Sequence, residues 1–234
     1  MDSTSALKFF GFTKQEAVVY TTLLRYGPQT GYEAAKNAGI SRSNAYGALA
    51  GLCEKGAAMK ASGDAKSYSA VPGKELIRNL RRQCDKTLDV LEKSLPDRQE
   101  TEAPYLTVSG FENVVDKAQN VLDEAEHHIY VSLNSHEATL LHDALCRATA
   151  RGLKTVIVSD TDPNVPECIY HFFPKDAGQF NIIADTSTVL TGSLDPELSS
   201  QCLYSKNTNL VRLMREAFVN ELELIRQREE KSNE

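Results

Sequence analysis

The sequence has no apolar run that approaches the roughly 20 residues a transmembrane helix requires. Its first residues also lack the basic-then-apolar order of a secretory signal peptide. These absences predict a cytoplasmic protein with no membrane partner. Apolar residues make up 41% of the 234 residues, which is enough for hydrophobic cores in one large or two modest domains.

Signals for metal, cofactor and nucleophile sites are also missing. The five cysteines form no Cys-x-x-Cys pair, so they predict reduced, mostly buried thiols, with a redox sensor as the alternative. Cys168 and His171 are half of a zinc pattern without a second half, and the histidines have no metal-ligand spacing. There is no Gly-rich phosphate loop and no Gly-x-Ser-x-Gly elbow. We therefore expect no metal, no cofactor and no catalytic residue.

The net charge of −6 hides a strong asymmetry along the chain. Residues 1–98 contain 15 Lys and Arg against 10 Asp and Glu, a balance of +5. Residues 99–234 contain 11 against 22, a balance of −11. Because phosphate contacts depend on the local charge, this segregation favours a nucleic-acid-facing N-terminal half and a solvated C-terminal half.

Helix-capping patterns organise the first 60 residues. Thr13-Lys-Gln-Glu16 is a capping box that opens a helix ending at Tyr26-Gly27-Pro28, and Thr30-Gly-Tyr-Glu33 opens a second helix. Gly39 ends the second helix, and Ser41 caps a third. Two short helices joined by a tight glycine turn are typical of a helix-turn-helix.

The third helix has two very different faces. One is apolar and is expected to pack inward, with Ala45, Leu49, Leu52 and Cys53. The other is small and polar, with Ser43, Asn44, Gly47, Ala50 and Gly51. Each glycine costs roughly 1 kcal/mol of helix propensity. Close approach to a DNA groove would explain that cost, whereas the alternative is an ordinary solvated face.

Two short strands, expected at residues 57–61 and 67–71 around Ser62-Gly63-Asp64, predict a hairpin wing after the third helix. A winged helix-turn-helix fits the DNA major groove, so the sequence indicates a regulator that binds double-stranded DNA. Arginine pairs with guanine and asparagine with adenine, lysines contact phosphates, and a tyrosine at the rim contacts phosphate or the core. The candidate DNA-binding residues are Arg42, Ser43, Asn44, Tyr46, Gly47, Lys60 and Lys66.

A long helix is expected from Pro72-Gly73 to about Leu95, where Pro96 stops it. Its apolar positions recur after eleven residues, which keeps a stripe along one side of a nearly straight helix. The stripe packs on its own chain or pairs with a second copy, and the symmetry of DNA readers favours a homodimer. The candidate dimerisation residues are Ile77, Leu80, Cys84, Leu88, Leu91 and Leu95.

The remainder alternates between strands and helices, which predicts an α/β domain. We expect helices at 111–126, 137–150 and 207–228, and strands at 128–133, 153–159, 180–184, 188–191 and 201–204. Polar side chains that follow the strands suggest an effector pocket, although helix capping also explains Asn134 and Ser135. Its candidate residues are Ser132, Asn134, Ser135, Asp160 and Asp185, a polar and acidic set that disfavours anionic ligands.

Several motifs together resemble the TrmB family of transcriptional regulators. In the N-terminal half they are Leu7-Lys-Phe-Phe-Gly-Phe-Thr13, Glu16-Ala-Val-Val-Tyr20, Gly39-Ile-Ser-Arg-Ser-Asn-Ala-Tyr46, Leu49, Leu52, Glu54-Lys-Gly56, Tyr68-Ser-Ala-Val-Pro72 and Glu75-Leu76. The resemblance implies operator binding by a dimer through the winged helix. It implies domains at 1–73 (winged helix-turn-helix), 74–96 (linker and dimerisation helix) and 105–234 (effector or interaction domain).

The second half is similar to half of a phospholipase D fold. The residues that carry this likeness are Gly110-Phe111, Arg151-Gly152-Leu-Lys-Thr-Val156, Ile183-Ala-Asp185 and Gly192-Ser193. The phospholipase D pattern is His-x-Lys-x-x-x-x-Asp, and alignment on Asp185 places Gly178 at the histidine and Phe180 at the lysine. Without the nucleophile and the cation, no phosphodiesterase activity is expected.

Three functions therefore stand after the sequence is read. The first is a homodimeric, sequence-specific transcription regulator with a possible small-molecule effector. The second is a nucleoid-type DNA binder without an effector, which the acidic second half disfavours because neighbouring copies would repel each other. The third is an enzyme on the phospholipase D scaffold, which Phe180 disfavours.

Overall fold

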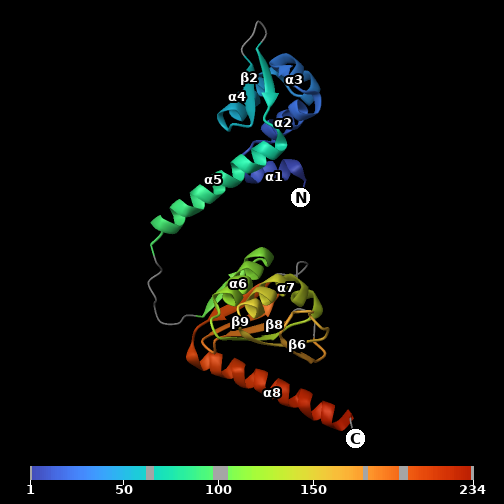
Figure 1. Cartoon of the computed structure of the whole chain (residues 1–234), viewed down its shortest axis with the longest axis vertical. Coiled ribbons are helices and arrows are strands. Elements are labelled where there is room, and N and C mark those ends of the chain that lie inside the picture. Colours follow the sequence, from blue (N-terminus) through green and yellow to red (C-terminus); the bar gives the residue numbers. More distant parts are fainter. Residues whose placement is uncertain (1, 62–65, 97–104, 176–178, 195–199, 233–234) are drawn as a thin grey trace. The chain divides into compact units, whose positions relative to one another are not determined.

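The computed structural model describes residues 2–61, 66–96, 105–175, 179–194 and 200–232 (Figure 1). The chain divides into two compact units, Met1–Asp97 and Arg98–Glu234. Among the described residues, no helix is both long and apolar enough to span a bilayer.

The N-terminal unit is a winged helix-turn-helix. Its three-stranded sheet is antiparallel in the order β1-β3-β2, so the hairpin of β2 and β3 forms the predicted wing. Helix α1 and strand β1 are not among the predicted elements. The elements are α1 (Ser3–Phe9), α2 (Lys14–Tyr26), β1 (Gln29–Thr30), α3 (Gly31–Ala38), α4 (Arg42–Glu54), β2 (Ala58–Ala61), β3 (Ser67–Ala70) and α5 (Gly73–Ser94).

The predicted caps are present in the structure. The Thr13 hydroxyl accepts the backbone N–H of Glu16, and the Glu16 carboxylate accepts the backbone N–H of Thr13. The pair Thr30 and Glu33 repeats this capping box at the start of α3, and Ser41 caps α4. Each cap satisfies N–H groups that a helix terminus leaves unpaired, so these short helices begin where the sequence places their caps.

A compact apolar core joins α2, α4 and the wing. Leu23 from α2 packs with Leu49 and Leu52 from α4, and all three are fully buried. The Tyr20 hydroxyl donates to the carbonyl of Val71 over 2.9 Å, which ties α2 to the end of the wing. Leu76 of α5 is buried in the same core, so the first turns of α5 belong to this unit.

Glu16 also fixes α4 against α2. Lys55, at the end of α4, places its ammonium 2.6 and 2.7 Å from the two Glu16 carboxylate oxygens. A Cβ atom at Gly51 would lie 2.0 Å from Glu16 Oε1. The expectation that Gly51 faces DNA is therefore wrong, because Gly51 is small to admit the Glu16 carboxylate. Nothing lies within 4 Å of a Cβ at Gly47, so that glycine remains open.

The second unit is a seven-stranded sheet with helices on both faces. The strand order is β4-β10-β9-β8-β5-β6-β7, in which only the β5–β6 and β6–β7 pairs are parallel. The elements are β4 (Leu106–Ser109), α6 (Phe111–Glu124), β5 (His128–Ser132), α7 (Ser135–Ala150), β6 (Lys154–Ser159), β7 (Ile169–Phe172), β8 (Phe180–Ala184), β9 (Thr188–Ser193), β10 (Gln201–Ser205) and α8 (Thr208–Ser232).

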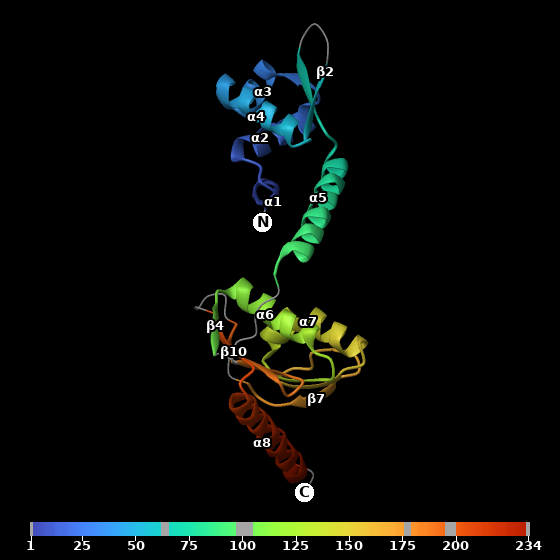
Figure 2. The same ribbon diagram turned by 90° about the vertical axis from the view of Figure 1, so that its left-hand side faces the viewer.

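Helices α6 and α7 cover one face of this sheet, and α8 lies along the other (Figure 2). The larger core lies under α6 and α7 and contains Leu122, Leu145 and Ile157. The core under α8 is smaller and includes Phe218 and Ile225. The sequence did not predict the two edge strands, β4 and β7, because each is four residues long and has a neighbour on one side only.

We predict opposite stability effects for the two glycines of α4. Gly47→Ala gains up to about 1 kcal/mol of helix propensity. Gly51→Ala gains the same propensity but displaces the Glu16 carboxylate from Thr13 and Lys55, and a lost cap alone costs about 1 kcal/mol. Urea denaturation should therefore show a stabilised Gly47→Ala and a destabilised Gly51→Ala. Equal stability of the two variants would contradict this account of Gly51.

The Glu16 interactions also predict a pH dependence. Burial opposes ionisation of Glu16, but the Lys55 ammonium and the Thr13 backbone outweigh it and hold the pKa below the ordinary 4.5. The stabilisation is then complete above the unfolded pKa and is lost as the pH falls through the folded pKa. In urea denaturation from pH 7 to pH 3.5, the stability difference between wild type and Glu16→Gln should shrink on acidification. A constant difference would contradict it.

Candidate nucleic-acid interface

The seven residues predicted to contact DNA are all exposed. Five of them lie on the N-terminal half of α4, and Lys60 and Lys66 lie on the arms of the wing. The expected turn at Ser62-Gly63-Asp64 lies outside the described residues. The buried residues of α4 are Ala45, Ala48, Leu49 and Leu52. One side of the helix therefore packs against the core, and the other side is free.

Arg42 is held at the start of α4 by an aromatic ring. Its guanidinium lies 4.4 Å from the ring centroid of Tyr32, which belongs to α3 and is itself 51% exposed. A cation over an exposed ring gains about 0.5–1 kcal/mol, which restricts the directions that a long side chain can take. The sequence analysis did not include Tyr32 among the candidate site residues. An exposed tyrosine between the two residues of a capping box is a pattern that could have indicated it.

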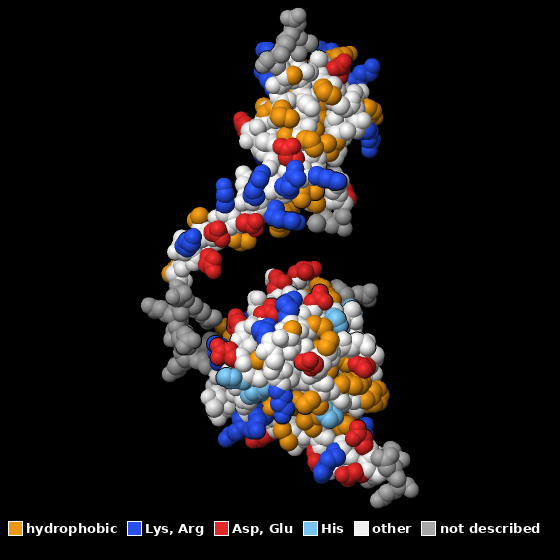
Figure 3. Space-filling view, in the orientation of Figure 1, with side chains coloured by type: hydrophobic (Ala, Val, Ile, Leu, Met, Phe, Trp, Pro, Cys, Tyr) orange, Lys and Arg blue, Asp and Glu red, His pale blue; other side chains and the backbone are white. Residues whose placement is uncertain are grey.

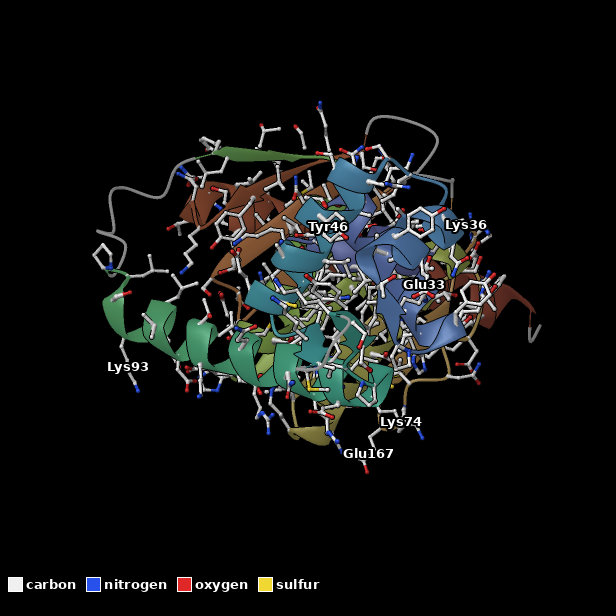
Figure 4. All side chains as sticks on the ribbon, turned by 90° about the horizontal axis from the view of Figure 1, so that it is seen from above. Glu33, Lys36, Tyr46, Lys74, Lys93 and Glu167 are labelled. Carbon is white, nitrogen blue, oxygen red and sulfur yellow. The ribbon has the colours of Figure 1, made fainter. Side chains whose placement is uncertain are left out.

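The position of the Tyr46 ring is fixed by its contact with the start of α3. A Cβ atom at Gly31 would lie 2.3 Å from Cε1 of the Tyr46 ring, so only glycine leaves room for that ring. Figure 4 shows Tyr46 on α4 beside the helix that carries Glu33 and Lys36. The tyrosine is 51% exposed, so it packs on α3 with one side and presents the other to solvent.

A row of cations runs along α5 and was not assigned from the sequence (Figure 3). Lys74, Arg78, Arg82 and Lys86 are spaced by four residues, which places them about 6 Å apart along the helix. No carboxylate of the described chain forms an ion pair with them. Arg82 and Lys86 also line a cleft of about 350 Å³, together with Glu54 and Lys55. This row can hold phosphate or another anion.

The apolar stripe of α5 is largely uncovered in the single chain. Ile77, Leu88, Leu91 and Leu95 are exposed, with Leu88 61% accessible, and Cys84 is exposed between them. Leu80 differs, since it packs partly against the core of its own unit. The stripe therefore starts inside the winged-helix unit and continues as an unpartnered apolar surface.

The structure does not bring the five expected effector-pocket residues together. Ser132 lines a cavity at the end of β5. Asn134 caps α7 in a capping box with Glu137, as the capping alternative predicted. Asp160 follows β6 at the same edge of the sheet. Asp185 lies at the opposite edge, because β8 is antiparallel to β5 and Ser132 pairs with Asn181.

Asp185 has a structural role in the fold. Its carboxylate accepts the backbone N–H groups of Glu126, His127 and His128 over 2.8–3.0 Å. Burial opposes its ionisation, but these hydrogen bonds lower its pKa below the ordinary value. Phe180, at the position of the phospholipase D lysine, is fully buried. The last residue of that motif thus anchors the start of β5.

The fold and the exposed face of α4 define a winged-helix protein of the DNA-binding regulator class. A family model described as sugar-specific transcriptional regulator TrmB matches residues 7–74. A second, described as the N-terminal EBD subdomain of transcriptional regulator TrmB, matches residues 106–222. The chain belongs to the TrmB family, which confirms the resemblance seen in the sequence.

Individual relatives are more distant. YrhO of Bacillus subtilis, called uncharacterized, is 24% identical over 230 residues, covering 94% of this chain and 84% of YrhO. TrmBL1 of Pyrococcus furiosus, an HTH-type sugar sensing transcriptional regulator, is 30% identical over 131 residues. That match covers 54% of this chain and 38% of TrmBL1, so the aligned region corresponds to well under half of that relative.

Two solved structures are similar to parts or all of the chain. TrmBL2, described as an archaeal chromatin protein, aligns over 94% of this chain and 97% of its own at 20% identity and a TM-score of 0.49. NucT from Helicobacter pylori aligns over 52% of this chain and 97% of its own, at 12% identity and a TM-score of 0.46. The α+β fold class agrees with the sequence prediction.

Proposed function

We propose that this TrmB-family regulator binds operator DNA sequence-specifically as a homodimer, with α4 in the major groove. The observation that carries the proposal is the free face of α4, where Gly47 is open and the neighbouring exposed side chains are short or polar. A helix without bulky side chains on one face can approach base edges closely. The positive balance of residues 1–98 supplies the electrostatic attraction.

Individual roles follow from position. Ser43 and Asn44 lie in the first turn of α4, where recognition helices contact bases, and Asn44 can pair with adenine. Arg42, oriented by Tyr32, reaches a guanine or a phosphate. Lys60 and Lys66 contact phosphates from the wing. These contacts divide into base readout at the helix and positioning at the backbone.

Dimer formation is proposed through the α5 stripe. Exposed leucines at regular spacing on a long helix are costly in water, and pairing two copies buries them. A two-fold dimer places two recognition helices about 34 Å apart, which matches successive major grooves. The alternative, packing on the same chain, accounts within the described structure for Leu80 but not for Leu88 to Leu95.

Regulation and the absence of catalysis are parts of the same proposal. A ligand in the C-terminal unit shifts the population of DNA-competent dimers if it binds one state more tightly than the other.

The phospholipase D histidine and lysine are replaced by Gly178 and Phe180, which argues against a phosphodiesterase. A cytoplasmic location, where chromosomal DNA is accessible, fits this role.

The second candidate is a DNA binder without sequence preference, which the cationic row on α5 favours because that row reads no base. Selection of binding sites from random duplex DNA by the full chain separates the two. We expect one inverted repeat with half-sites about 10 base pairs apart or a multiple of that spacing. Recovery of no consensus would replace the operator model with non-specific binding.

Two substitutions separate base readout from backbone contact. Asn44→Ala should cost about 1–3 kcal/mol on the selected site and relax the preference at one position. Lys66→Ala should weaken cognate and random duplexes alike and reduce the slope of log K against log salt by about one. Both are measured by fluorescence anisotropy. Equal loss on cognate and random DNA for Asn44→Ala would remove it from base readout.

Cys84 reports on the proposed dimer because it lies within the α5 stripe. A short bis-maleimide should link two copies through Cys84, and Cys84→Ser should abolish the link. Cys202 is an internal negative control, since burial raises its pKa to about 11 and keeps the thiol protonated. Leu88→Glu should convert the dimer to monomer in sedimentation while leaving the unit folded. A Leu88→Glu dimer would contradict pairing through α5.

A further inference from the structure

A cavity of about 350 Å³ lies between the second face of the large sheet and α8. Its walls come from the end of β5, the middle of β8, the segment before β8 and the central turns of α8. Neither Phe180 nor Asp185 lines it, although Gln179, Asn181 and Ile183 of the same segment do. The walls fall into a polar end and an apolar side, so it resembles a site for a molecule with two chemically different parts.

The polar end is built around a buried ammonium group. The Lys175 side chain is 11% exposed, and its Nζ donates to the Ser132 hydroxyl and to the Glu221 carboxylate of α8. Asn181 accepts a hydrogen bond from the Thr191 hydroxyl through Oδ1, which leaves its amide nitrogen available as a donor. An ammonium has three N–H groups, and the described hydrogen bonds of Lys175 use two of them. The Phe173 ring lies 5.4 Å from the same Nζ, measured to the ring centroid.

The apolar side consists of large side chains from the sheet and from α8. Phe173 and Ile183 face Met214, Phe218 and Leu224 across the cavity. The Phe218 ring is also packed against Tyr130 at 5.5 Å between centroids, so this wall is held by the core under α8. A chain of several methylene groups would replace water along this wall.

We propose that this cavity binds a small organic acid, with its carboxylate at Lys175 and Asn181 and its aliphatic body between Phe173 and Phe218. The site extends the proposed function, for which it supplies the effector position. The sequence predicted a pocket that disfavours anionic ligands. That prediction did not include Lys175, which lies far from β5 and β6 in the sequence. Tertiary structure brings its charge to the ends of those strands.

Lys175 and Glu221 are the charged residues that line the cavity in the described part of the chain, and the Lys175 ammonium is the group that an anion can contact. Glu221 already pairs with Lys175, so an incoming carboxylate competes with Glu221 for one ammonium, and binding loosens a contact between the sheet side and α8. Burial, with a smaller contribution from Asp160, raises the pKa of Glu137, which also interacts electrostatically with Lys175. A cationic ligand would have to displace the buried ammonium itself.

The test is isothermal titration of the full chain, without DNA, with butyrate, hexanoate and octanoate at constant ionic strength. Each added methylene should tighten binding by about fourfold until the cavity is filled. Hexanol and hexylamine have the same number of carbon atoms but no carboxylate, and should bind at least tenfold more weakly than hexanoate. Equal binding of hexanol, or tighter binding of hexylamine, would overturn the proposal.

Two variants and one control assign the site. Lys175→Met should weaken hexanoate roughly tenfold to a hundredfold, because a charge-assisted hydrogen bond is lost. Glu221→Gln should strengthen it, because the competing carboxylate is removed. Lys154→Met changes an exposed lysine of β6 and should have no effect. Unchanged hexanoate affinity in Lys175→Met would contradict the assignment, and so would a loss of hexanoate affinity in Glu221→Gln. The second variant keeps the test decisive if the first folds poorly.

Because these titrations contain no DNA, a failure of DNA binding leaves their outcome intact. Anisotropy on the selected operator with saturating hexanoate then tests the regulatory role separately. We expect a change of at least fivefold in operator affinity, a typical lower value for allosteric coupling. An unchanged affinity with confirmed hexanoate binding would refute the regulatory role of the cavity.

Discussion

The placement of α4 depends on one buried carboxylate. Glu16 closes the capping box of α2, pairs with Lys55 at the end of α4 and fills the space that Gly51 leaves. Because the contacts with Lys55 and Gly51 use the same carboxylate, a shift of α4 along α2 breaks both of them together. This interaction, near the C-terminal end of α4, therefore fixes the orientation of the free face, which lies in the N-terminal half of the helix.

Folding and the proposed DNA contact use separate parts of the same helix. The apolar face of α4 and the Glu16 contact build the core, whereas Arg42, Asn44 and Gly47 carry little of the packing. The packing that does reach the free face comes from α3, where Tyr32 supports Arg42 and Gly31 admits Tyr46. Substitutions on this face can therefore change binding with little change in stability. The same separation recurs in the C-terminal unit, where Asp185 supports the fold and the cavity under α8 is free for a ligand.

Much of the fold could be predicted because its signals are local. Capping boxes such as Thr13–Glu16 and the glycine turn at Gly39 fix helix ends within a few residues of sequence. The candidate site was predicted only in part, since exposure of Asn44 follows from helical periodicity but the support of Arg42 by Tyr32 does not. Edge strands β4 and β7 were missed because hydrogen bonding to a distant neighbour, and not their own pattern, makes them strands.

The sequence by itself determined where helices begin and end and which face of α4 is apolar. These properties depend on residues within one or two helical turns. Only the tertiary structure decided why Gly51 is small, that Asp185 lies far from Ser132, and that Lys175 meets Glu221. Each of those facts depends on the relative placement of residues at least 35 positions apart, which is set by the packing of whole elements and leaves no local pattern.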